Sequence, residues 1–113
     1  MRRSSLLNPS LCLTEESETE VQERYSGFGS EIFRRLFVSI PWLRPHFRFF
    51  KAENSDDVWS ICKFGDLEFG LQLDPDTCCI CIWDHNWHDE VGKWIEDPEK
   101  FTIELIKERY LKI

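Results

Sequence analysis

Polar and apolar residues alternate through the middle of the chain in three short runs, at residues 58–64, 67–73 and 78–83. Such alternation, rich in β-branched and aromatic side chains, is typical of strands that bury one face. Gly65 and Asp66 separate the first two runs and predict a two-residue hairpin turn, which pairs Lys63 with Glu68 across the ladder. The four residues 74–77 predict a second hairpin. We therefore expect a three-stranded antiparallel meander.

The two predicted turns agree on which side chains share a face. The second turn predicts three cross-strand pairs: Leu73 with Cys78, Leu71 with Ile80, and Phe69 with Ile82. One face is then apolar and should meet the core: Val58, Cys62, Phe64, Leu67, Phe69, Leu71, Leu73, Cys78, Ile80 and Ile82. The other face holds a semi-apolar strip beside Gly70: Trp59, Ile61, Cys79, Cys81 and Trp83. Either another segment covers this strip or a partner docks on it.

Helical signals precede the meander. Ser17 and Glu20 have the spacing of a capping box, so a helix should begin there. A second helix should begin at Ser30 and end before Pro41, with an apolar side formed by Ile32, Phe33, Leu36, Phe37 and Ile40. The residues that follow suit a strand near a sheet edge, because three of them are aromatic: Phe47, Phe49 and Phe50.

A third helix should close the chain, with Asp97 as its cap and Pro98 in its first turn. Its expected buried stripe contains Phe101, Leu105, Ile106, Tyr110 and Ile113, and leaves out Ile103. This helix should pack on the sheet face that carries Leu67, Phe69 and Leu71. The predicted fold class is α+β: one or two N-terminal helices, an antiparallel meander of three to four strands and a C-terminal helix. Residues 1–16 are predicted as a flexible tail and residues 17–113 as one domain.

Composition narrows the possible partners. The 113 residues are 42% hydrophobic and 14% aromatic, which is enough for one buried core. The net charge of −7 disfavours nucleic acid as a partner, because phosphates would be repelled. Residues 14–23 hold five acids and no base, residues 24–51 have a net charge of +5, and residues 52–113 hold six bases against fifteen acids. Internal pairing with the acids, or contacts in a homodimer, should therefore account for the basic middle.

Five cysteines form an odd set, and the N-terminus lacks the apolar run of a secretory leader, because Asn8 and Pro9 interrupt it. No stretch of the sequence is apolar for the length of a membrane span. We therefore expect a cytoplasmic protein with free thiols, no membrane partner and no cofactor.

Candidate chemistry is concentrated after the third strand, where tryptophan, histidine and carboxylates share residues 83–90. Aromatic anchors inside an acidic rim are typical of protein-binding surfaces, and such a rim favours a basic partner such as a nuclease. The predicted partner-binding residues are Asp84, Trp87, His88, Asp89, Glu90 and Trp94. This interpretation predicts a protein-binding inhibitor that is not an enzyme.

Three other interpretations remain open. A small hydrolase could use an acid–base pair from this segment: His85 or His88 with Asp84 or Asp89. A zinc-binding structural domain could use Cys78 and Cys81 with the two histidines, but residues three apart on a flat strand point to opposite faces. Alternatively, Trp87 and Trp94 fold back as lids on the core, and the acids are simply solvated.

The segment ICIWDHNWH at residues 80–88, followed by the helix from Phe101 to Tyr110, resembles small bacterial immunity-type proteins. In many of these toxin inhibitors a hairpin strand leads into a Trp-His loop and a closing helix. The resemblance covers roughly the last half of the chain. It implies a cytosolic inhibitor that binds a cognate toxin, often by acidic mimicry of the toxin's substrate. A phage-encoded inhibitor of a host defence nuclease would share this pattern, as would a small acidic secretion chaperone that acts as a dimer.

Overall fold

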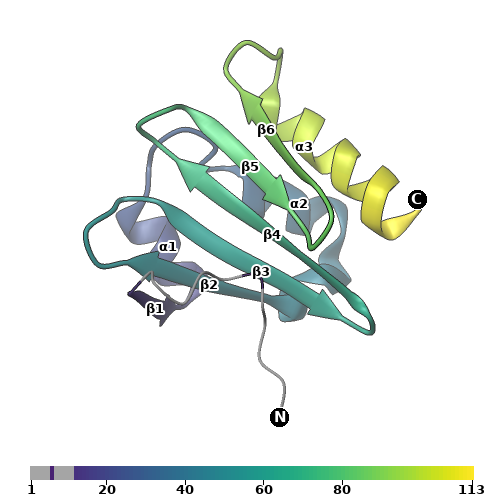
Figure 1. Ribbon diagram of the computed structural model, residues 1–113, viewed down its shortest axis with the longest axis horizontal. Coiled ribbons are helices and arrows are strands. Elements are labelled where there is room, and N and C mark those ends of the chain that lie inside the picture. Colours follow the sequence, from purple (N-terminus) through teal and green to yellow (C-terminus); the bar gives the residue numbers. More distant parts are fainter. Residues whose placement is uncertain (1–5, 7–11) are drawn as a thin grey trace.

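The computed structural model, which describes Leu6 and residues 12–113, contains one antiparallel sheet in which each strand pairs with the next along the chain (Figure 1). Its strands are β1 (Leu13–Glu16), β2 (Phe47–Ala52), β3 (Val58–Phe64), β4 (Leu67–Asp74), β5 (Cys79–Trp83) and β6 (His88–Gly92). The helices are α1 (Glu18–Arg24), α2 (Ile32–Ser39), the 3-10 helix η1 (Pro41–His46), α3 (Pro98–Ile106) and the π-helical turn η2 (Lys107–Leu111). The predicted α+β class with an antiparallel meander is confirmed.

The sheet has six strands rather than the predicted three to four, because a short strand extends the meander at each end. β1 lies within the predicted tail and pairs with β2, with Leu13 opposite Ala52. The predicted domain boundary at residue 17 is therefore too late, and residues 1–5 and 7–11 of that predicted tail lie outside the described residues. β6 lies in the acidic and aromatic segment after the third predicted strand, where no further strand was predicted, and pairs with β5.

The first predicted hairpin is confirmed, with Lys63 opposite Glu68 and a left-handed Gly65 in the turn, at φ 56°. The second hairpin is shifted by two residues, because Leu73 pairs with Ile80 rather than with Cys78. Cys78 has a left-handed backbone (φ 54°) and belongs to the turn instead of the strand. A shift by an even number of residues leaves every side chain on its predicted face.

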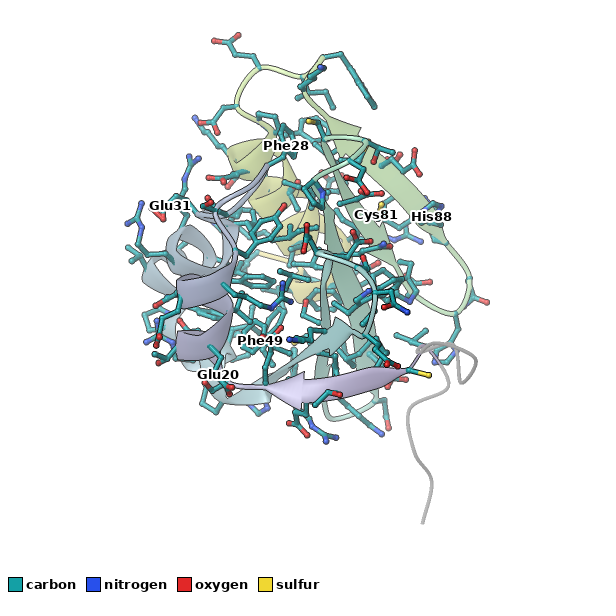
Figure 2. All side chains as sticks on the ribbon, turned by 90° about the vertical axis from the view of Figure 1, so that its left-hand side faces the viewer. Glu20, Phe28, Glu31, Phe49, Cys81 and His88 are labelled. Atoms are coloured by element: carbon teal, nitrogen blue, oxygen red, sulfur yellow. The ribbon has the colours of Figure 1, made fainter. Side chains whose placement is uncertain are left out.

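The helices cover the apolar face of the sheet (Figure 2). α1 begins with the predicted capping box: the Ser17 hydroxyl accepts the Glu20 N–H at 3.1 Å, and the Glu20 carboxylate accepts the Ser17 N–H at 2.9 Å. α2 ends before Pro41, as predicted, and its Phe33 ring packs edge to face on Phe49 of β2 with ring centroids 4.9 Å apart. Helix and sheet thus enclose one core between them.

The C-terminal helix packs on the predicted face, because Tyr110 stacks on Phe69 with ring centroids 4.3 Å apart. Its predicted buried stripe is only partly confirmed: Ile106 is buried, and Leu105 and Tyr110 pack against the core. Ile103 is buried, whereas Phe101 and Ile113 are 45% and 71% exposed. α3 is therefore rotated about its axis relative to the orientation that hydrophobic spacing predicts.

Contacts between α2 and the start of α3 explain this rotation. Arg35 donates to both carboxylate oxygens of Asp97, at 2.8 and 3.0 Å, and to Glu99 at 3.1 Å. Glu99 also accepts the backbone N–H of Glu31 at 3.0 Å. These bonds fix which side of α3 meets α2, and hydrophobic spacing carries no information about them.

All five cysteines are free thiols, and Cys62, Cys79 and Cys81 are buried in the sheet. Burial raises the pKa of the Cys62 thiol to about 12, so this thiol stays protonated at neutral pH. Among the residues that the structure describes, none of the helices has the length and apolar character needed to cross a membrane.

Candidate functional site

The turn at residues 84–87 joins β5 to β6 and is fastened to the C-terminal helix. Asp84 organises it: its N–H donates to the Trp87 carbonyl at 2.8 Å, and its carboxylate accepts the Asn86 N–H at 2.7 Å. The same carboxylate accepts the Tyr110 hydroxyl at 2.8 Å. The Arg109 guanidinium lies 3.5 Å from Asp84 and covers the Trp87 ring at 4.0 Å. Asp84 and Trp87 thus make their contacts with other residues of this protein.

The groups around Asp84 stabilise its negative charge. Burial by itself would raise the pKa of this carboxyl group, but the Asn86 N–H, the Tyr110 hydroxyl and the positive Arg109 together lower the pKa below its ordinary 3.8. Burial and the Asp84 carboxylate in turn raise the pKa of the Tyr110 hydroxyl. Trp87 packs against the core, as the lid interpretation expected.

His85 points from this turn toward the β3–β4 hairpin, where its Nε2 lies 3.0 Å from Glu68 Oε1. The hydrolase interpretation had combined the histidine with Asp84 or Asp89 instead. An open groove of about 1200 Å³ lies beside this pair, between the hairpin and the C-terminal helix. None of the described residues that line the groove is a serine, threonine or cysteine that could act as a nucleophile.

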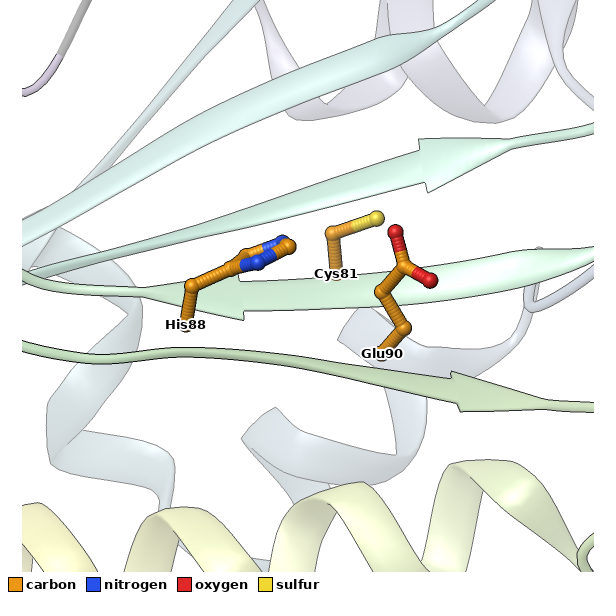
Figure 3. A group of neighbouring side chains, drawn as sticks. All are labelled: Cys81, His88 and Glu90. Carbon is orange, nitrogen blue, oxygen red and sulfur yellow. The ribbon is translucent and has the colours of Figure 1, made fainter.

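Cys81, His88 and Glu90 come together on the outer face of the sheet, the face away from the helices (Figures 2 and 3). Cys81 of β5 lies directly opposite Glu90 of β6, and the neighbouring pair is Trp83 with His88. The Cys81 Sγ, a ring nitrogen of His88 and a carboxylate oxygen of Glu90 all lie within 4.8 Å of one another. The thiol is buried and the other two side chains are exposed. Burial, followed by the nearby Glu90 charge, raises the pKa of the Cys81 thiol to about 12.

Two glycines allow indole rings to lie against this outer face. A Cβ atom at Gly70 would lie 2.4 Å from the Trp83 ring, and one at Gly92 would lie 2.1 Å from the Trp94 ring. Trp83 meets Trp59 edge to face, with ring centroids 5.9 Å apart. Trp94 is nevertheless 68% exposed, so it is not a lid on the core. The semi-apolar strip thus ends in an exposed tryptophan beside β6.

The six predicted partner-binding residues do not form one patch. They divide into three groups: Asp84 and Trp87 in the turn, His88, Glu90 and Trp94 on the outer face, and Asp89 on the side of β6 that faces the helices. Asp89 lies opposite the buried Ile82 but is itself exposed at the sheet edge. The exposed members all belong to β6 or to the residues just after it.

Ion pairs neutralise the basic middle of the chain. The pairs are Arg24 with Glu16, Arg44 with Glu18, Arg48 with Glu15, Arg34 with Glu31, and Arg35 with Asp97 and Glu99. The arginines therefore show the internal pairing that the sequence suggested. Within the described part of the chain, Asp89 and Glu90 have no ion-pair partner. The β6 edge consequently keeps its negative charge.

No family model, curated protein or solved structure matches this chain.

The sequence suggested Cys81 as a possible zinc ligand together with Cys78, and gave no prediction that Cys81 lies beside Glu90. The signal for the observed cluster was the two-residue spacing of His88 and Glu90, which puts both side chains on one face of a strand. That signal becomes visible only once residues 88–92 are recognised as a strand.

Proposed function

We propose that this protein is an inhibitor, not an enzyme, and that it binds a basic protein through the exposed side chains of β6 and the adjoining Trp94. The observation that carries this proposal is Trp94, an indole that is 68% exposed although it follows an ordered strand. Tryptophan is enriched among the residues that dominate binding energy, since it buries a large surface with little loss of conformational freedom.

Charge supports a basic partner. Asp89 and Glu90 carry no ion pair among the described residues, while the arginines of the basic middle are paired with acids. An unneutralised acidic edge steers a positively charged surface toward it and adds specificity. The phosphate-binding cleft of a nuclease is such a surface, so we propose a nuclease toxin or defence nuclease as the partner. Occupying that cleft would exclude the nucleic-acid substrate.

The proposed contact residues differ in role. His88, Asp89, Glu90 and Trp94 are exposed and would touch the partner directly. Asp84 and Trp87 would act through position, because they tie the β5–β6 turn to the C-terminal helix and so hold β6 in place.

Affinity capture tests the proposal. The tagged full-length protein would be incubated with a lysate of the cells that produce it, and captured proteins would be identified by mass spectrometry. The purified captured protein would then be titrated by calorimetry against Trp94→Ala and against Asp89→Lys/Glu90→Lys. Two matched controls change equivalent groups elsewhere: Trp42→Ala, at another exposed tryptophan, and Glu23→Lys/Glu53→Lys, with the same change in net charge.

Both β6-side variants should bind a basic nuclease at least about 30-fold more weakly, the loss expected for a binding hot spot. The controls should stay within about threefold of the wild type, since surface contacts outside an interface contribute little. Equal weakening by the two charge reversals would show that only net charge matters. Wild-type affinity in Trp94→Ala would exclude this surface.

A further inference from the structure

The outer face of β5 and β6 carries a cluster of three metal-ligand types, two of which, His88 and Glu90, are also proposed partner contacts. Cys81 offers a sulfur, His88 an imidazole nitrogen and Glu90 a carboxylate oxygen, all within 4.8 Å of one another (Figure 3). We propose that these three side chains bind a zinc ion and leave its fourth coordination position open. This site was not expected from the sequence, which paired Cys81 with Cys78 and predicted no cofactor.

The spacing suits zinc after small side-chain movements. In a tetrahedral site, with Zn–S near 2.3 Å and Zn–N or Zn–O near 2.1 Å, two ligand atoms lie about 3.4–3.6 Å apart. Closing the cluster to that spacing takes a movement on the order of 1 Å. His88 and Glu90 are both exposed and can rotate about their side-chain bonds, while the buried Cys81 provides the fixed point.

The backbone brings the three side chains to one face of the sheet before any metal arrives. Cys81 and Glu90 are direct cross-strand partners in the β5–β6 ladder, and His88 lies two residues from Glu90 on the same face of β6. Because residues two apart in a strand point the same way, all three side chains project from one side of the sheet. Only the side-chain rotations of His88 and Glu90 then remain to be fixed when the metal binds.

The donor set selects the metal. A thiolate and an imidazole disfavour Mg²⁺ and Ca²⁺, which prefer oxygen, and they suit Zn²⁺ or Co²⁺. With Cys81 deprotonated, His88 neutral and Glu90 ionised, the ligands carry two negative charges, which balance the divalent ion. Binding converts the Cys81 thiol to a zinc-bound thiolate and releases its proton to water. Because protons compete with the metal for the Cys81 sulfur and the His88 nitrogen, zinc affinity should fall in acid.

Three protein ligands leave the fourth coordination position open, unlike structural zinc sites, in which four protein ligands surround the ion. The open position would hold water or a donor atom from outside the chain. Since β6 is the last strand of the sheet, the ion would also join it to β5 through side chains in addition to the backbone ladder.

Cobalt and zinc titrations of the reduced, chelator-treated full-length protein test this site. Co²⁺ should give a thiolate-to-metal absorption band in the near ultraviolet, and Zn²⁺ should displace it. Cys81→Ser should remove the band, and His88→Gln should weaken zinc binding at least about tenfold. Cys79→Ser is the matched control: Cys79 is also buried on the outer face of β5, two residues away. Circular dichroism would verify that each variant is folded.

The proposal is wrong if the wild-type protein gives no cobalt band, or if the band survives Cys81→Ser. It is also wrong if Cys79→Ser removes the band while the protein remains folded. Trp94→Ala separates the two proposals, because it removes the docking tryptophan and leaves all three ligands intact. If that variant loses partner binding and keeps normal zinc affinity, the docking proposal and the zinc proposal are both supported. Either proposal can fail without the other.

Discussion

Removing the Tyr110 hydroxyl tests whether Asp84 anchors the β5–β6 turn. Tyr110→Phe keeps the ring stacked on Phe69 and deletes the 2.8 Å hydrogen bond to the Asp84 carboxylate. A hydrogen bond to a charged group contributes about 1.5–3 kcal/mol, and we expect about 1.5 kcal/mol because Arg109 still faces the carboxylate. At an unfolding entropy of about 2.1 cal/mol/K per residue, this loss lowers the Tm of the 113-residue chain by about 6 °C.

Thermal unfolding at pH 7 of the wild type, Tyr110→Phe, Asp84→Asn and the double variant measures this contribution as a double-mutant cycle. The two single changes should be coupled by at least about 0.5 kcal/mol, since Tyr110→Phe removes the hydrogen bond and Asp84→Asn removes the charge that strengthens it. A Tm within 1 °C of the wild type for Tyr110→Phe, with additive effects in the double variant, would refute the anchoring role. Asp84 would then become a candidate contact for the partner again.

Acid provides a second check on the same bond. The folded-state pKa of Asp84 is lower than its ordinary 3.8, so the stabilisation from its charge is present above that value and is lost as the pH falls. The destabilisation by Tyr110→Phe should therefore shrink below pH 3.8. A constant difference between variant and wild type would mean that the charge of Asp84 has no part in the bond.

Two further predictions concern the scaffold. Gly70→Ala would bring a Cβ atom to 2.4 Å from the Trp83 ring, so the ring must move. Stability should therefore fall by about 1–3 kcal/mol, and the near-ultraviolet circular dichroism of the tryptophans should change. An unchanged spectrum would contradict the packing of Trp83 on Gly70. The Arg35 guanidinium, helped by the Lys100 N–H, lowers the pKa of Asp97 to about 2, so its stabilisation is present above 3.8 and lost toward pH 2. Asp97→Asn should flatten the Tm profile in that interval, whereas an unaltered slope would exclude this pair as its source.

The central hairpin and the first helix could be predicted because their signals are local. Gly65 supplies the left-handed backbone that a two-residue turn requires, and Ser17 with Glu20 satisfies the free N–H groups at a helix start. The side chains were assigned to the correct faces of the sheet despite the error in register, because the shift was an even number of residues. The unexpected left-handed backbone of Cys78, a residue type without a preference for that region, caused the error.

The ends of the sheet could not be predicted, because their strands show little alternation. In β6 the exposed His88, Asp89 and Glu90 precede the buried Val91, so a polar run conceals the strand. Residues 88–92 form a strand because their backbone pairs with β5, and not because polar and apolar residues alternate. The rotation of α3 likewise depends on ion pairs with α2, which are distant in sequence.

The residue types of the candidate site could be predicted, but their grouping could not. Clustered aromatic and acidic residues marked the segment from Asp84 to Trp94 before any strand was assigned there. Which of them face outward follows from the pairing of β6, and Cys81 enters the site only through that pairing. The sequence also gave no indication that the Tyr110 hydroxyl would donate a hydrogen bond to the Asp84 carboxylate.

Site-specific photo-crosslinking tests the central claim most directly, namely that the β6 side of the molecule binds a basic protein. A photoreactive benzoylphenylalanine would replace Trp94 in one protein and the exposed Trp42, at the other end of the sheet, in a second. Irradiation in the producing cells should yield one abundant covalent adduct with a basic nuclease from position 94 and none from position 42. The same adduct from both positions, or from position 42 alone, would contradict the account.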